Sequence, residues 1–109
     1  MLRSLLVATI LLAAASSPAA AATRTVRIGD NWFVRASGSR TVTVDQGTRV
    51  RWRWTGRNEH NVSVRRGPVR FESAFKRSGT FGRTVRRRGT YRIVCEIHEP
   101  GMRMRLVVR

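Results

Sequence analysis

From Thr23 onward, apolar and polar side chains alternate residue by residue, and this alternation constrains the fold more than any other feature of the sequence. In the run Arg49–Trp54, Val50, Trp52 and Trp54 share one phase and three arginines share the other. Successive side chains of a β-strand point to opposite faces, so this pattern is typical of half-buried strands. The same alternation occurs in Thr41–Val44, Tyr91–Ile93 and Met104–Leu106.

Turn-forming residues interrupt these runs at short intervals, as in Asp45-Gln46-Gly47 and Gly67-Pro68. Seven to eight short strands with such turns favour an antiparallel β-sandwich. Helical periodicity is not sustained anywhere, and at most a short helical turn is expected around residues 71–77. The sequence therefore predicts one all-β domain over residues 23–109.

Residues 1–22 have the pattern of a secretory signal peptide. Arg3 precedes an apolar run from Leu5 to Ala15, and small residues end in Ala20-Ala21-Ala22 before Thr23. The apolar run has about half of the ~20 residues that a membrane helix needs. We therefore expect an exported protein, periplasmic or extracellular, without stable insertion in a membrane.

The chain is strongly basic, with 22 Lys+Arg against 6 Asp+Glu and a formal net charge of +16. Such a charge can indicate a nucleic-acid binder, but an exported protein is separated from most nucleic acid, so none is expected as a partner. Most arginines occupy the polar phase of predicted strands. They form either a solvated outer face, with their stems covering apolar surface, or a cationic docking surface for an acidic partner. We expect a monomer.

The chain has one cysteine and two histidines, which excludes an intramolecular disulfide and a zinc finger built on four Cys/His ligands. Cys95, His98 and Met102 lie on one predicted loop, and His60 lies far upstream, at the start of a strand predicted over residues 60–64. Two imidazoles, one thiolate and a weak axial thioether are the ligands of a type 1 copper centre. An unpaired thiol is a liability in an oxidising compartment, and metal ligation explains why Cys95 is retained. Met104 is a competing axial candidate.

The sequence resembles the cupredoxins, especially the small plastocyanin, amicyanin and pseudoazurin group, over nearly all of residues 23–109. The resemblance is carried by the following stretches: Val26–Phe33, Val44–Trp52, His60-Asn61-Val62, Gly89–Cys95 and Met104–Val108. It implies an all-β, antiparallel Greek-key β-sandwich that holds one copper ion.

The resemblance also implies a role for each site residue. His60, Cys95 and His98 match the imidazole, thiolate and second imidazole ligands, and Met102 matches the axial ligand. Asn61 matches the side chain that ties the two ligand-bearing segments together, in support of a rigid site. One departure is that three residues separate His98 from Met102, where the family most often has two or four.

Three glutamates, Glu59, Glu96 and Glu99, lie beside or near the candidate ligands. Their position is either a coincidence or a device that offsets local positive charge and lowers the copper potential.

The leading functional hypothesis is an exported blue copper protein that carries one electron between Cu(I) and Cu(II), through His98, to an acidic redox protein. The alternative is copper trafficking or sequestration on the same fold. A third hypothesis is a cationic module that binds anionic polymers and whose ligand-like residues are accidental. We do not expect an enzyme, because Cys95 and His98 share a tight loop and so small a sandwich offers no obvious substrate cleft.

Overall fold

The structure is a computed structural model that describes residues 3–11 and 22–109. The predicted signal peptide, residues 1–22, includes residues 1–2 and 12–21, which lie outside the described residues. Residues 3–11 form no regular secondary structure. Within the described part of the chain, no helix has the length and apolar character needed to cross a membrane.

The described residues form eight strands and no helix. The strands are β1 (Thr23–Gly29), β2 (Trp32–Phe33), β3 (Thr41–Val44), β4 (Thr48–Trp54), β5 (Ser63–Arg66), β6 (Thr80–Val85), β7 (Gly89–Val94) and β8 (Arg103–Val108). This confirms the all-β prediction. The helical turn expected around residues 71–77 is absent, since Glu72 and Lys76 form extended β-bridges with Ser63 and His60.

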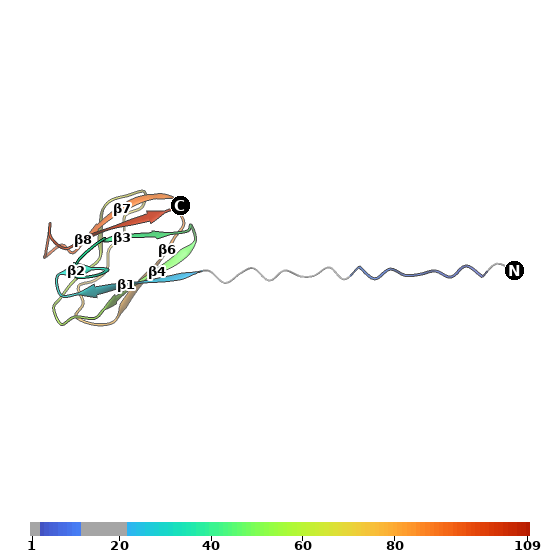
Figure 1. Ribbon diagram of the computed structural model, residues 1–109, viewed down its shortest axis with the longest axis horizontal. Helices are drawn as coiled ribbons and strands as arrows, with labels where there is room; N and C mark the ends of the chain where they lie inside the picture. Colours follow the sequence, from blue (N-terminus) through green and yellow to red (C-terminus); the bar gives the residue numbers. More distant parts are fainter. Residues whose placement is uncertain (1–2, 12–21) are drawn as a thin grey trace.

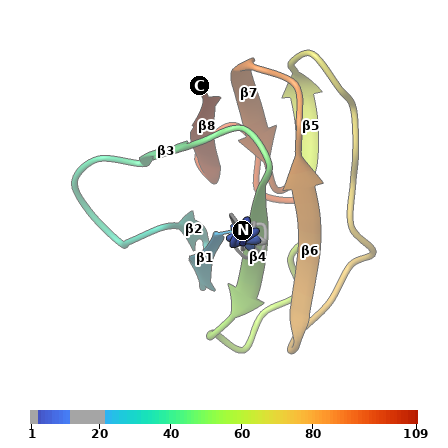
Figure 2. The same ribbon diagram turned by 90° about the vertical axis from the view of Figure 1, so that its right-hand side faces the viewer.

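The strands form two four-stranded sheets, in the orders β2-β1-β4-β6 and β3-β8-β7-β5. Figures 1 and 2 show them as the two layers of a sandwich. The sheets are mixed rather than antiparallel throughout, because β1 pairs with β4 and β3 pairs with β8 in parallel. Side-chain alternation reports which face of a strand is buried but not the direction of its neighbour, so the sequence pattern missed these two pairs.

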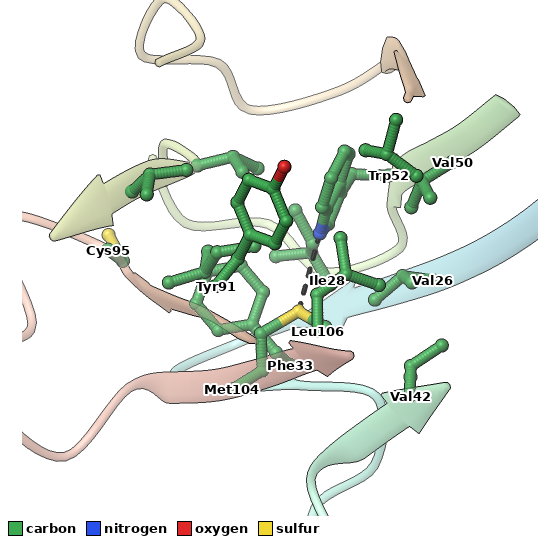
Figure 3. Close-up of a cluster of buried hydrophobic side chains, with 14 of the residues drawn as sticks. Val26, Ile28, Phe33, Val42, Val50, Trp52, Tyr91, Cys95, Met104 and Leu106 are labelled. Atoms are coloured by element: carbon green, nitrogen blue, oxygen red, sulfur yellow. Dashed lines mark hydrogen bonds between the residues drawn. The ribbon is translucent and has the colours of Figure 1, made fainter. Parts of the chain in front are cut away.

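The core lies between the sheets and consists of the apolar phase of the strands. Trp52, Ile28, Phe33 and Leu106 are fully buried, and Figure 3 shows them in one cluster with Cys95 at its side. Strand β4 alternates strictly between buried and exposed residues, as the sequence predicts. Its arginines therefore face solvent while its valine and tryptophans fill the core.

Candidate metal centre

The loop between β7 and β8 carries three of the four candidate ligands. Cys95 directly follows the end of β7, and Met102 directly precedes β8. The backbone N–H of Cys95 donates to the carbonyl of Met102 at 3.1 Å, and that of Met102 donates to the carbonyl of His98 at 3.0 Å. The N–H of His98 donates in turn to the carbonyl of Cys95 at 3.1 Å. This closed set of bonds fixes the three residues relative to one another.

His60 comes from a separate segment, just before β5 rather than at the start of that strand. Its backbone exchanges two hydrogen bonds with Lys76, both 2.9 Å long. Its carbonyl also accepts a hydrogen bond from the indole Nε1 of Trp54 at 3.2 Å. The residue is fully buried, so packing and backbone bonds together fix the direction of its ring.

The structure brings His60, Cys95 and His98 together in a single cluster. The two Nδ1 atoms of the imidazoles lie 3.2 Å apart. The Sγ atom of Cys95 lies 3.4 Å from Nδ1 of His98 and 3.9 Å from Nδ1 of His60. Donors that bind one first-row metal ion at about 2.0–2.3 Å have separations of this order. The donor set and its geometry therefore fit a single ion that accepts nitrogen and sulfur ligands.

Asp30 orients the ring of His60, and sequence analysis did not identify this role. Oδ1 of Asp30 lies 3.3 Å from Nε2 of His60, on the side of the ring away from Cys95. A proton on Nε2 that is held by the carboxylate leaves the lone pair of Nδ1 free for a metal. Thirty positions separate the two residues, and no local motif links a turn aspartate to a distant histidine.

The turn before His60 holds the Asp30 carboxylate in place. The backbone N–H groups of Arg57 and Asn58 donate to it at 2.9 and 2.8 Å, and these bonds lower the pKa of Asp30 below its usual value. A Cβ atom at Gly56 would lie 2.2 Å from Oδ1 of Asp30, so the close approach requires glycine there.

Burial keeps His60 in the form that binds metals. Its pKa is lowered chiefly because burial disfavours the charged ring, and a charge on His98 would lower it further. The contact with Asp30 opposes this shift without cancelling it. Neutral imidazole is the form that ligates metal ions.

Asn61 joins the two ligand-bearing segments. Its side chain is buried, its Nδ2 donates to Oε1 of Glu96 at 3.0 Å, and its Oδ1 accepts from the N–H of Glu96 at 2.9 Å. The bond from Asn61 is the main cause of a lowered pKa at Glu96. Glu99 is held by Arg65, which lowers its pKa in the same way. Asp30 thus contacts the imidazole ring of a candidate ligand. Glu96 and Glu99, in contrast, bind Asn61 and Arg65.

The two candidate axial methionines lie in different surroundings. Met102 is buried in the loop and its backbone is bonded to both Cys95 and His98. Met104 points into the core from β8, where its sulfur accepts a hydrogen bond from Nε1 of Trp52 at 3.4 Å (Figure 3). Its sulfur is thus engaged by the core. The role of Met102 as a ligand stays a prediction.

The cluster is open to the surface on one side. His60 and Cys95 are fully buried, but His98 is only half-buried, and its neighbour Ile97 is 54% exposed. An exposed apolar side chain therefore lies next to the ligand that is closest to solvent.

Solved structures with this fold include several forms of amicyanin. An oxidised amicyanin mutant is 25% identical over 82% of this chain and 82% of its own, with a TM-score of 0.66. A Cu(I) form of another amicyanin mutant is 24% identical over 84% of this chain and 87% of its own, with a TM-score of 0.68.

A copper-containing nitrite reductase from Thermus scotoductus SA-01 is 21% identical over 78% of this chain but only 22% of its own, with a TM-score of 0.63. No protein-family model and no curated protein sequence matches the chain. The chain therefore has the fold that amicyanin has.

Proposed function

We propose that this chain, a protein of the cupredoxin fold, is an exported type 1 copper protein that carries one electron at a time. The observation that carries the proposal is the convergence of the Cys95 sulfur and the His60 and His98 Nδ1 atoms within 3.9 Å of one another. A thiolate suits Cu(I) and imidazole suits both oxidation states, so this donor set accepts copper in either form.

His60, Cys95 and His98 would hold the copper, and Met102 would supply a further sulfur. The bound metal supplies the one-electron couple between Cu(I) and Cu(II). The chain supplies rigidity, because each ligand backbone is hydrogen-bonded and Asn61 ties the two segments together. A site that hardly rearranges between the two oxidation states transfers electrons with a small reorganisation cost.

His98 is the proposed route for the electron. It is the least buried of the three clustered donors and lies beside exposed Ile97. A redox protein that docks at this loop would therefore approach the metal through the His98 ring. The excess of arginine favours a partner with an acidic surface.

Export is part of the proposal. The first strand begins at Thr23, the residue that follows the predicted cleavage site. Removal of residues 1–22 would thus leave all eight strands in place and would remove one backbone hydrogen bond, from the N–H of Arg49 to the carbonyl of Ala22. The mass of the protein recovered from the exported fraction checks this, and a chain that retains residues 1–22 would contradict it.

The same site could serve copper trafficking, and the rigid ligand loop favours electron transfer over metal exchange. Two of the three donors are fully buried and hydrogen bonds fix the loop, so we expect copper to be released slowly. We do not propose an enzyme, because the donor atoms of this site face one another in the interior.

Repeated voltammetric cycling of copper-loaded protein, followed by a copper assay, separates the two roles. A carrier gives a reversible one-electron wave and retains its copper in the presence of a Cu(I) chelator. Rapid loss of copper to the chelator without a reversible wave would contradict the carrier role and support trafficking.

A further inference from the structure

An arginine-lined groove lies on the solvent side of the β3-β8-β7-β5 sheet. It encloses about 660 Å³. Its arginines are Arg40, Arg65, Arg66, Arg92, Arg103 and Arg105, and we call it the arginine groove. Among the described residues that line it, Glu99 is the one acidic side chain. The net charge of the chain does not show where its charges lie, whereas the groove shows that six arginines gather on one face.

Three of these arginines form a row across the sheet. Arg92 on β7 lies directly opposite Arg66 on β5 and directly opposite Arg105 on β8. Neighbouring strands are about 4.8 Å apart, and like charges directly opposite each other destabilise a sheet. Among the paired strands of the other sheet, one such pair occurs, Arg27 and Arg53. The row of three therefore carries the larger repulsion.

A bulge in β5 adds a further cation to the groove. The register of β5 against β7 shifts between Val64 and Arg66, and both Arg65 and Arg66 are exposed and line the groove. Regular alternation would turn one of two successive side chains inward, and bulges redirect side chains in this way.

The groove already binds one carboxylate of the chain itself. Nε of Arg65 donates to Oε1 of Glu99 at 2.7 Å, and a second guanidinium nitrogen donates to Oε2. Arginine binds carboxylates most strongly in this bidentate geometry. Carboxylates are therefore suitable ligands for the remaining arginines of the groove.

The groove is continuous with the ligand loop. Glu99 and Pro100, which line it, directly follow His98, and Arg40 donates to the carbonyl of Gly101 at 3.4 Å. A molecule in the groove would lie alongside the loop that carries three of the proposed copper ligands.

We propose that the arginine groove is the docking site for an acidic segment of a partner protein, whose carboxylates pair with the row Arg66, Arg92 and Arg105. The binding follows from the charge and shape of the groove alone. The transfer of an electron to that partner rests on the proposed function. Docking here would place the partner beside His98 and set its orientation.

The test compares two triple variants of the copper-loaded protein in a fluorescence anisotropy titration with a labelled hexaglutamate peptide. The row variant is R66Q/R92Q/R105Q. The control variant, R49Q/R51Q/R53Q, removes the same charge from the exposed phase of β4 in the other sheet. Both variants remove repulsion between arginines that lie opposite each other, since Arg53 lies opposite Arg27 in the control sheet. We therefore expect neither to melt below the wild-type protein, and R92Q alone replaces the row variant if the latter does not fold.

We expect the row variant to weaken peptide binding about tenfold or more and the control about threefold or less. Equal weakening in both variants, or no binding of the peptide to the wild-type protein, would overturn the proposal. Tighter row-dependent binding of tripolyphosphate or of phosphatidylglycerol vesicles than of the peptide would also overturn it, in favour of a phosphate ligand.

The absorption spectrum of the same samples separates this inference from the proposed function. A copper–thiolate band together with row-independent binding contradicts the docking site alone. Row-dependent binding without such a band contradicts the electron carrier and leaves the docking site supported.

Discussion

At the scale of single residues, the imidazole of His60 cannot turn freely. Its Nε2 faces Asp30 and its backbone is bonded to Lys76 and Trp54. The residue types of the cluster could be predicted from the sequence, because thiolate and imidazole are rare in this chain. Asp30 could not, because its role depends on a fold that brings distant turns together.

Asp30→Asn tests this orienting contact. The amide removes the charge that favours a proton on Nε2, so we expect copper affinity to fall about 10- to 100-fold, measured by competition with a chelator. Asp45→Asn is the matched control, because Asp45 is 84% exposed and pairs with Arg109 at the surface. Equal affinities in the two variants would show that Asp30 does not orient the ligand.

The two methionines of the C-terminal region are predicted to differ in their effect on the metal. Met102→Leu removes the proposed axial sulfur, so we expect a shift in reduction potential with little loss of stability. Met104→Leu removes the sulfur that Trp52 contacts in the core, so we expect the potential to stay unchanged. Voltammetry of both variants measures the difference, and a shift confined to Met104→Leu would reverse the assignment.

Tyr91 gives the fold a predictable dependence on alkaline pH. Burial raises the pKa of its hydroxyl, an effect that the nearby charge of Arg87 reduces. The unfolded chain releases this proton near pH 10 and the folded chain only above that, so stability falls as the pH rises beyond about 10.

Tyr91→Phe removes this dependence together with the hydrogen bond to the carbonyl of Arg87. We expect the variant to be about 1 kcal/mol less stable at pH 7. The difference from wild type should narrow as the pH rises beyond about 10, measured by chemical denaturation. If the difference in unfolding free energy between the variant and the wild-type protein stays constant up to about pH 11.5, burial of the Tyr91 hydroxyl does not explain the pH dependence.

At the scale of elements, the site depends on how firmly the segment before β5 is attached to the β7–β8 loop. The buried side chain of Asn61 makes two hydrogen bonds to Glu96, one to its carboxylate and one to its backbone N–H. Loss of this tie would leave the loop held by its own backbone bonds and by two exposed contacts, the Arg65–Glu99 ion pair and the hydrogen bond from Arg40 to Gly101.

Asn61→Ala should lower the free energy of unfolding by about 1–3 kcal/mol, because the partly buried N–H of Glu96 loses its partner. Hydrogen exchange should also accelerate in residues 95–98. Asn58→Ala is the control, since it retains the backbone N–H that Asn58 donates to Asp30. Unchanged exchange in the loop of Asn61→Ala would contradict the tie.

The sequence predicted the strands better than their pairing. Alternation in β4 and β8 matches the buried and exposed residues of the structure, because burial of one sheet face imposes a period of two. The parallel pairs β1–β4 and β3–β8 were missed, since alternation is the same whichever way a neighbour runs. His60 was expected at the start of a strand, but β5 begins at Ser63 and His60 forms a single bridge to Lys76.

At the scale of the whole molecule, six of the 22 Lys+Arg residues line a single groove. The sequence shows that arginines occupy the polar phase of the strands. Only the register shows that Arg66, Arg92 and Arg105 stand in one row and that the groove around them adjoins the ligand loop. The proposed docking of an acidic partner therefore belongs to this face of the molecule, beside the ligand loop.

The visible absorption and EPR spectra of copper-loaded protein, compared with those of Cys95→Ser, test the central claim most directly. The hydroxyl retains the size of the side chain but cannot act as a thiolate ligand. We expect an intense visible band from thiolate-to-copper charge transfer in the wild-type protein and its loss in the folded variant. A wild-type protein that binds copper without this band, or a variant that retains it, would contradict the type 1 copper centre.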